Sequence, residues 1–162
     1  MTVTRFAAKR VLFVSNGGIC RAPMAAGLLR RLVLEAGLRG GIDVAAASVS
    51  GIHVGQAPAG AAIEAAAARG YDIGGMRVRR FDPADMTRFA DVLVPDGTVL
   101  TALRSLAPHG LAGRPQMLTR YSGRGLVDIV DPYGGTPHDF QIALDLIELS
   151  CRGLVAALER RG

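Results

Sequence analysis

Residues 11–24, VLFVSNGGICRAPM, join a short apolar run to a glycine-containing turn and an arginine. The four apolar residues at 11–14 predict a buried strand, and Pro23 opens an Ala/Leu/Arg-rich stretch that is typical of a helix. A loop between a strand and a helix directs backbone N–H groups and a helix N-terminus at one place, which suits a dianion such as phosphate. A glycine pair alone is often only a tight turn. Arg21 favours an anion site, because its guanidinium can bind a phosphate with two parallel hydrogen bonds.

The segment from Ser15 to Arg21, followed by Ala-Pro-Met, resembles the phosphate loop of the low-molecular-weight protein-tyrosine phosphatases, Cys-x5-Arg-Ser/Thr. A second motif of that family, Asp-Pro-Tyr, stands at residues 131–133. Three segments between the two motifs fall in register with the family: 51–55, 68–72 and 89–93. The resemblance covers residues 11–160 and implies one phosphatase-like domain over residues 1–162.

Ser15 stands where the resemblance places the nucleophilic cysteine. A thiolate forms near neutral pH when a helix N-terminus and an arginine stabilise it, whereas a serine hydroxyl needs a general base beside it. No residue of the loop can serve as that base. The backbone donors and Arg21 do not depend on the nucleophile, so we predict phosphate binding without turnover.

The resemblance assigns roles to further residues. Asp131 takes the place of the general acid that protonates the leaving phenol oxygen; without the family it is a turn residue before Pro132. Tyr133 and Ile52 take the places that flank a slot for the phosphotyrosine ring; alone, Tyr133 is a surface turn aromatic. The phosphate-binding positions are Ser15, Asn16, Gly17, Gly18, Ile19, Cys20 and Arg21.

Several residues depart from the family pattern. Gly18 replaces an asparagine, Ala22 a serine or threonine, and Met76 a histidine, and in the family these polar groups fix the loop and hydrogen-bond the thiolate. Their joint loss indicates a chain no longer selected for thiolate chemistry, because an engineered trap would change one residue only. Gly18 can still hold a positive φ. Pro95 and Ile52 replace a methionine and an aromatic residue of the family, so the substrate preference stays open.

The histidines and cysteines give weaker signals. His53 and His138 are predicted to be surface or capping residues. Cys20 matches a second loop cysteine of the family, which can form a disulfide with the nucleophilic cysteine. Ser15 makes that bond impossible. As a substitute nucleophile, Cys20 would attack from a different direction. Cys151 is predicted to be a core residue. The cysteines match no zinc or redox spacing, so we expect no metal, no cofactor and a reducing cytoplasm.

Alternating strand and helix patterns predict a three-layer α/β/α domain, with a four-stranded parallel sheet and helices on both faces. Ser15 then lies at the carboxyl end of its strand, where ligands bind in such sheets. A short helix is expected to start at Asp82 as N-cap with Pro83 in its first turn. The predicted strands are 11–14, 44–49, 91–94 and 116–119; the predicted helices are 23–36, 57–69, 98–106 and 139–160; and 120–138 is a functional loop.

The composition fits one bacterial α/β domain of 162 residues, 49% of them hydrophobic. The net charge of +5 comes from scattered arginines, and with 5% aromatic residues the chain has no stacking platform, which argues against nucleic acid as a partner. Residues 1–10 precede too short an apolar run for a signal peptide or a membrane span, so a soluble cytoplasmic protein is expected.

The predicted function is therefore an inactive phosphatase-like protein that binds phosphate or a phosphotyrosine ligand. Three alternatives stay open. The first is an active tyrosine phosphatase carrying a Cys-to-Ser trapping change. The second is arsenate reduction on the same fold, which needs a loop cysteine and a thiol relay. The third is an interaction module without an anion site.

Overall fold

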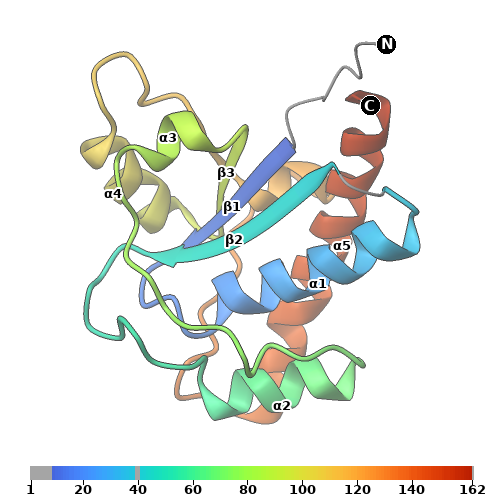
Figure 1. Ribbon diagram of the computed structural model, residues 1–162. Helices are drawn as coiled ribbons and strands as arrows, with labels where there is room; N and C mark the ends of the chain where they lie inside the picture. The colour runs from blue at the N-terminus through green and yellow to red at the C-terminus, as the bar shows by residue number, and fades with distance from the viewer. Residues whose placement is uncertain (1–8, 39–40, 162) are drawn as a thin grey trace.

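The computed structural model describes residues 9–38 and 41–161 (Figure 1), so residues 1–8 of the N-terminal segment considered above lie outside it. Its centre is a parallel four-stranded sheet in the order β2-β1-β3-β4. The strands are β1 (Lys9–Ser15), β2 (Ile42–Ser48), β3 (Asp91–Val94) and β4 (Pro115–Met117). The predicted fold class is confirmed.

Helices cover both faces of the sheet (Figure 1). The apolar run of β1 is continuous because successive side chains enter opposite cores. Val11 and Phe13 pack in a cluster with α1, α2 and α5, whereas Leu12 and Val14 pack in a cluster with α3 and α4. The helices are α1 (Arg21–Glu35), α2 (Gly60–Ala68), α3 (Asp85–Arg88), α4 (Gly97–Leu106), the 3-10 helix η1 (Leu118–Tyr121) and α5 (Pro137–Arg161).

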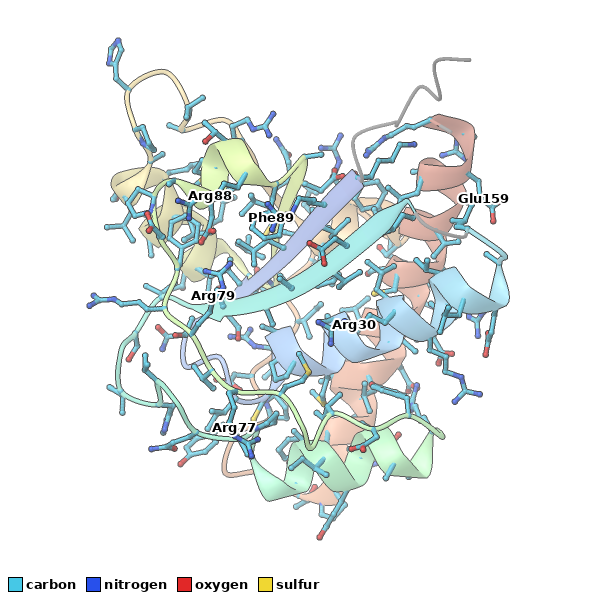
Figure 2. The ribbon with its side chains drawn as sticks, viewed as in Figure 1. Arg30, Arg77, Arg79, Arg88, Phe89 and Glu159 are labelled. Atoms are coloured by element: carbon cyan, nitrogen blue, oxygen red, sulfur yellow. The ribbon has the colours of Figure 1, made fainter. Side chains whose placement is uncertain are left out.

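The helix expected at Asp82 starts later. Asp82 Oδ1 accepts the Ala84 N–H at 2.9 Å, and the Asp82 carbonyl oxygen accepts the Asp85 N–H at 2.7 Å, so Pro83 lies in a turn and α3 begins at Asp85. Asp85 is buried and receives two hydrogen bonds from Arg79, at 2.9 and 3.2 Å. The Arg79 guanidinium carbon also lies 5.9 Å from the centre of the Phe89 ring (Figure 2). The predicted N-cap was wrong because Asp82 closes a turn before the helix, and Asp85, which binds Arg79, is the first helical residue.

Most other boundaries differ from the prediction by a few residues, and two of these differences have a local cause in the structure. The predicted helix 57–69 begins only at Gly60, because Ala59 is extended, with φ −54° and ψ 140°. The predicted strand 116–119 ends at Met117, and residues 118–121 form η1. There the buried Thr119 hydroxyl donates to the Val127 carbonyl oxygen at 2.7 Å instead of continuing the sheet.

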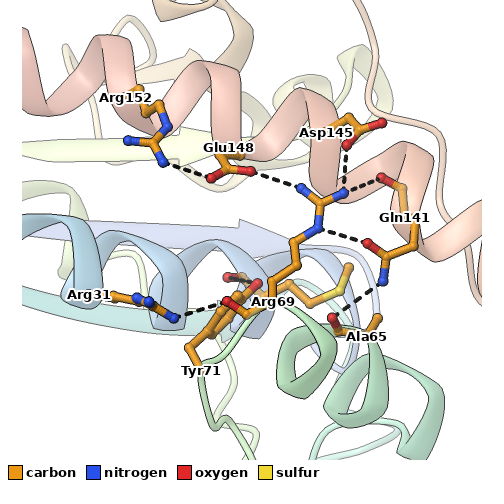
Figure 3. A network of polar contacts seen from close by, with 9 residues as sticks. Arg31, Ala65, Arg69, Tyr71, Gln141, Asp145, Glu148 and Arg152 are labelled. Carbon is orange, nitrogen blue, oxygen red and sulfur yellow. Dashed lines mark hydrogen bonds and ion pairs between the residues drawn. The ribbon is translucent and has the colours of Figure 1, made fainter.

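Arg69, at the C-terminal end of α2, joins that helix to α5 (Figure 3). Its guanidinium donates to Gln141 Oε1 at 2.7 Å, to Asp145 Oδ1 at 2.5 Å and to Glu148 Oε2 at 2.9 Å. Arg31 of α1 donates to the Gly70 carbonyl oxygen at 2.6 Å in the same network. This network fixes α2 against α1 and α5, and α2 follows directly after the segment that borders the site.

Gly153 lets α5 approach η1 closely. A Cβ at this position would overlap the Tyr121 carbonyl oxygen, a backbone atom that cannot rotate away. We expect Gly153→Ala to lower the free energy of unfolding by about 1–3 kcal/mol or more, measured by urea denaturation. Gly60→Ala is the matched control, since a Cβ at Gly60 meets nothing within 4 Å. Equal stability of the two variants would contradict this close packing.

Within residues 9–38 and 41–161, no helix is both long enough and apolar enough to cross a membrane.

Candidate active site

Neighbouring segments hold the loop after β1 by donating backbone N–H groups to its carbonyl oxygens. The Val49 N–H donates to the Ser15 carbonyl oxygen at 3.0 Å, and the Ser50 N–H donates to that of Asn16 at 2.9 Å. On the other side, the Ala59 N–H donates to the Ile19 carbonyl oxygen at 2.9 Å. These bonds are possible because β2 pairs with β1 in register up to its last residue, so the segment after β2 runs beside the loop.

The N–H groups of the same loop are free. Among the described residues, the backbone N–H groups of residues 16–21 have no hydrogen-bond acceptor, although residues 18–21 are buried. Cys20, at the N-cap of α1, makes no side-chain capping bond. Buried backbone donors are nearly always paired in folded proteins, so a row of unpaired donors at a helix N-terminus is a feature of an anion site.

Arg21 is buried, with 4% of its surface exposed, and one side of its guanidinium is fixed. Nη1 donates to Asp96 Oδ2 and to the Ile129 carbonyl oxygen, both at 2.6 Å. Asp96 is itself fixed, because its Oδ1 accepts the Val99 N–H at the start of α4. Nε and Nη2 of Arg21 have no hydrogen-bond acceptor in the described part of the chain, and Nη2 lies 3.9 Å from Asp131 Oδ2. The guanidinium is thus held in place with a free side.

Ser15 lies under the loop with 3% of its surface exposed. Its Oγ accepts a hydrogen bond from the Ala22 N–H, in the first turn of α1, at 3.3 Å. No carboxylate or histidine bonds to this hydroxyl among the described residues. The arrangement therefore provides a donor that stabilises negative charge at position 15 but no base that would take the serine proton.

One pocket of about 390 Å³ brings the predicted site residues together. Its walls beyond the loop include Asp131, Tyr133 and Ile52, and the last two side chains are strongly exposed, at 62% and 78%. Asp131 Oδ1 accepts the Tyr133 N–H at 3.1 Å, so Asp131 is both a turn residue and part of the pocket wall. The loop residues that line the pocket are Ser15, Asn16, Gly17, Gly18, Ile19, Cys20 and Arg21.

His53 also lines this pocket, a position that the sequence analysis did not predict. The half-buried ring lies against Gly17 and faces Tyr133, with 6.4 Å between the ring centres and 53° between the planes. Its Nδ1 is 3.0 Å from Gln56 Oε1, which orients the ring. The signal that could have found it is its place in the segment 51–55, next to Ile52. His138, in contrast, is exposed at the start of α5, as predicted.

Cys20 is not suited to act as a nucleophile. Burial, together with the negative charge of Asp131, raises the pKa of its thiol to about 12, against the lowering effect of Arg21. We expect no alkylation of Cys20 in the folded protein at about pH 8, because only about one thiol in ten thousand is then ionised. The measurement is mass spectrometry after iodoacetamide treatment, with urea-unfolded protein as the positive control. Rapid labelling of folded protein at Cys20 would contradict this environment.

Cys151 is fully buried in α5, as predicted, and burial raises the pKa of its thiol. Within the described ranges, no group of three or more His, Cys, Asp or Glu side chains is placed to hold a metal ion.

The sequence model of the low molecular weight phosphotyrosine protein phosphatase family matches residues 10–162. The chain belongs to this family. Its relatives include the low molecular weight protein-tyrosine-phosphatase of Streptomyces coelicolor, 33% identical over 156 residues, covering 94% of each chain. The low molecular weight protein-tyrosine-phosphatase YfkJ of Bacillus subtilis is 31% identical over 151 residues, 93% of this chain and 96% of YfkJ.

Solved structures of the low molecular weight phosphatase family share the fold. The crystal structure of YfkJ superposes with a TM-score of 0.89 at 30% identity and covers 97% of this chain and 98% of YfkJ. That of the low molecular weight phosphotyrosine phosphatase VcLMWPTP-2 of Vibrio cholerae gives a TM-score of 0.88 at 25% identity, covering 96% and 99%.

Gly18, Ala22 and Met76, where the sequence analysis expected the loss of polar side chains, fit their surroundings in the structure. Gly18 has φ +74°, a conformation that glycine adopts without strain. The Ala22 N–H binds Ser15, and Met76 is half-buried against the core beside α1. The loop is thus built without polar side chains at these positions.

Proposed function

We propose that this member of the low molecular weight phosphotyrosine protein phosphatase family binds phosphate, or a phosphotyrosine group, at residues 15–21 and does not hydrolyse it. The observation that carries the proposal is the set of unpaired N–H groups at residues 16–21 that border the same pocket as the free side of Arg21. Together they supply the donors that a dianion needs, and a guanidinium whose charge is shared with Asp96.

The lack of turnover follows from Ser15, which we place at the position of the family's cysteine nucleophile. The hydroxyl ionises far less readily than a thiol, and among the described residues it has only the Ala22 N–H as a partner. Asp131 keeps the place of the general acid, but a leaving group is not released when nothing attacks the phosphorus. We therefore infer that Asp131 is a remnant of the catalytic machinery.

The walls around the anion position favour an aromatic phosphate ester. Ile52 and Tyr133 expose apolar surface at the pocket mouth, and His53 adds a second ring opposite Tyr133. An aryl group can bury its faces against these side chains while its phosphate sits in the loop. Ile52 and Tyr133 are accordingly proposed as the substrate slot, with His53 as a third wall.

We also propose that the chain works as a single domain in a bacterial cytoplasm. The first strand and the last helix share one core, and both cysteines are free thiols. Nucleic acid and membrane surfaces are not proposed as partners.

The test combines binding and turnover. Inorganic phosphate or vanadate is expected to raise the melting temperature at constant ionic strength, since a ligand at about 100 times its Kd adds about 2.7 kcal/mol of stability. Sodium chloride at equal ionic strength is the control.

The wild-type protein is expected to hydrolyse p-nitrophenyl phosphate no faster than Ser15→Ala does. Turnover that disappears in Ser15→Ala would overturn the proposal, and absence of any anion-induced shift would favour an interaction module without an anion site.

A further inference from the structure

Ser48, the last residue of β2, is fully buried directly beside the loop. Its hydroxyl donates to the Ser50 carbonyl oxygen at 2.6 Å and also lies 3.2 Å from the Arg79 carbonyl oxygen, a second acceptor. Its backbone N–H donates to the Arg79 carbonyl oxygen at 2.9 Å, and its carbonyl oxygen accepts the Phe81 N–H at 2.7 Å. Ser48 therefore joins the end of β2, the segment after Met76 and the turn at Ser50.

The two residues that follow Ser48 connect it to the loop at residues 15–21. Ser50 donates its N–H to the Asn16 carbonyl oxygen, and Val49 donates its N–H to that of Ser15. The two donors follow Ser48 in the chain, Val49 directly and Ser50 one residue later. When the hydroxyl of Ser48 binds the Ser50 carbonyl, it fixes the peptide turn that presents these two N–H groups to the first residues of the loop.

The side chain of Ser48 also fills the space opposite Gly18. A Cβ at Gly18 would lie 2.7 Å from the Ser48 Cβ and 3.1 Å from the Val78 Cγ1, and the first distance is shorter than packed carbon atoms allow. Gly18 has φ +74°. The loop therefore turns at Gly18, which has no side chain and packs against the small, hydrogen-bonded side chain of Ser48.

We propose that Ser48 is the positioning residue of the phosphate loop. Its Cβ packs on Gly18 and its hydroxyl fixes the Ser50 turn, and together these contacts hold the N–H groups of residues 16–21 toward the pocket. In this chain Ser48 fixes the loop, which is one of the two roles that the family resemblance assigns to polar side chains at positions 18, 22 and 76. The expected effect of Ser48 on phosphate affinity rests on the proposed function. Its effect on the conformation of the loop rests on the loop geometry alone.

The first test is Ser48→Ala, which keeps the Cβ and removes the hydroxyl. We expect the Kd for inorganic phosphate, measured by calorimetry, to rise about two- to tenfold, the effect of one lost hydrogen bond. Hydrogen exchange of the Val49 and Ser50 amides is expected to accelerate. The matched control is Ser150→Ala: Ser150 is also fully buried, and its hydroxyl donates to the Leu146 carbonyl oxygen at 2.7 Å within α5, away from the loop. It should lower stability without changing the Kd or these two amides.

The second test is a double-mutant cycle. Gly18→Ala and Ser48→Gly are each expected to weaken phosphate binding, and the double variant is expected to lose less than the sum of the two effects, because Ser48→Gly removes the closest contact of the new Cβ. Additive effects would overturn the direct fit of the two residues.

The outcomes separate the two proposals. If the wild-type protein binds no phosphate while the Val49 and Ser50 amides still loosen in Ser48→Ala, the proposed function fails and the positioning role stands. If neither the Kd nor these amides change in Ser48→Ala, the positioning role is overturned and phosphate binding is unaffected.

Discussion

Arg21→Lys is expected to weaken phosphate binding about 10- to 100-fold, because charge-assisted hydrogen bonds contribute about 1.5–3 kcal/mol. The guanidinium holds Asp96 and the Ile129 carbonyl with Nη1 and still offers Nε and Nη2 to an anion. One ammonium group cannot satisfy these two acceptors and bind an oxyanion in the same geometry. The measurement is calorimetric titration of inorganic phosphate at constant ionic strength.

Lysine is chosen over alanine because removal of the charge would leave the Asp96 carboxylate without its ion-pair partner and destabilise the fold. Arg104→Lys, an exposed change in the last turn of α4, is the control and should bind phosphate like the wild type. An unchanged Kd in Arg21→Lys would show that this arginine serves only to link the loop to Asp96 and Ile129.

Ser15→Cys is expected to gain slow hydrolysis of p-nitrophenyl phosphate that Ser15→Ala and the wild type lack. The thiolate would be stabilised by the Ala22 N–H, which already binds the atom at this position, and by the N-terminus of α1. Gly18, Ala22 and Met76 offer no polar side chain to the thiolate. Since loss of one such donor costs about 10²- to 10³-fold, we expect a rate at least that far below the Streptomyces coelicolor relative assayed in parallel.

The assay of Ser15→Cys needs a reducing agent and a Cys20→Ser partner variant, because the new thiol could pair with Cys20. A transient phosphocysteine seen by mass spectrometry would identify the attacking atom. Rates equal to those of the relative would contradict the idea that the supports have decayed. They would favour an active phosphatase whose cysteine had been exchanged to trap substrate.

The two central strands, β1 and β3, could be predicted from the sequence because their apolar residues are buried on both faces of the sheet. The apolar residues at 11–14 and 92–94 form continuous buried runs, and β3 was placed at its observed ends. The start of α3 could not be predicted, because it depends on Arg79 binding the buried Asp85.

The lining of the candidate pocket could be predicted where it comes from one continuous segment, and was missed where it depends on strand register. The loop at 15–21 is local, so its residues could be named. His53 reaches the pocket because β2 pairs with β1 up to Ser48, and the clamp on Arg21 needs Asp96 and Ile129 from two distant loops. The close contact between Ser48 and Gly18 depends on the same β1–β2 register, and no local sequence pattern predicts it.

The most direct test of the central claim is a crystal structure of the wild-type protein grown with phosphate. We expect an anion in the pocket, bound by N–H groups of residues 16–21 and by the Arg21 guanidinium, with the Ser15 hydroxyl facing the phosphorus and no covalent bond between them. A pocket without the anion at saturating phosphate, or loop N–H groups turned away from a common centre, would contradict it.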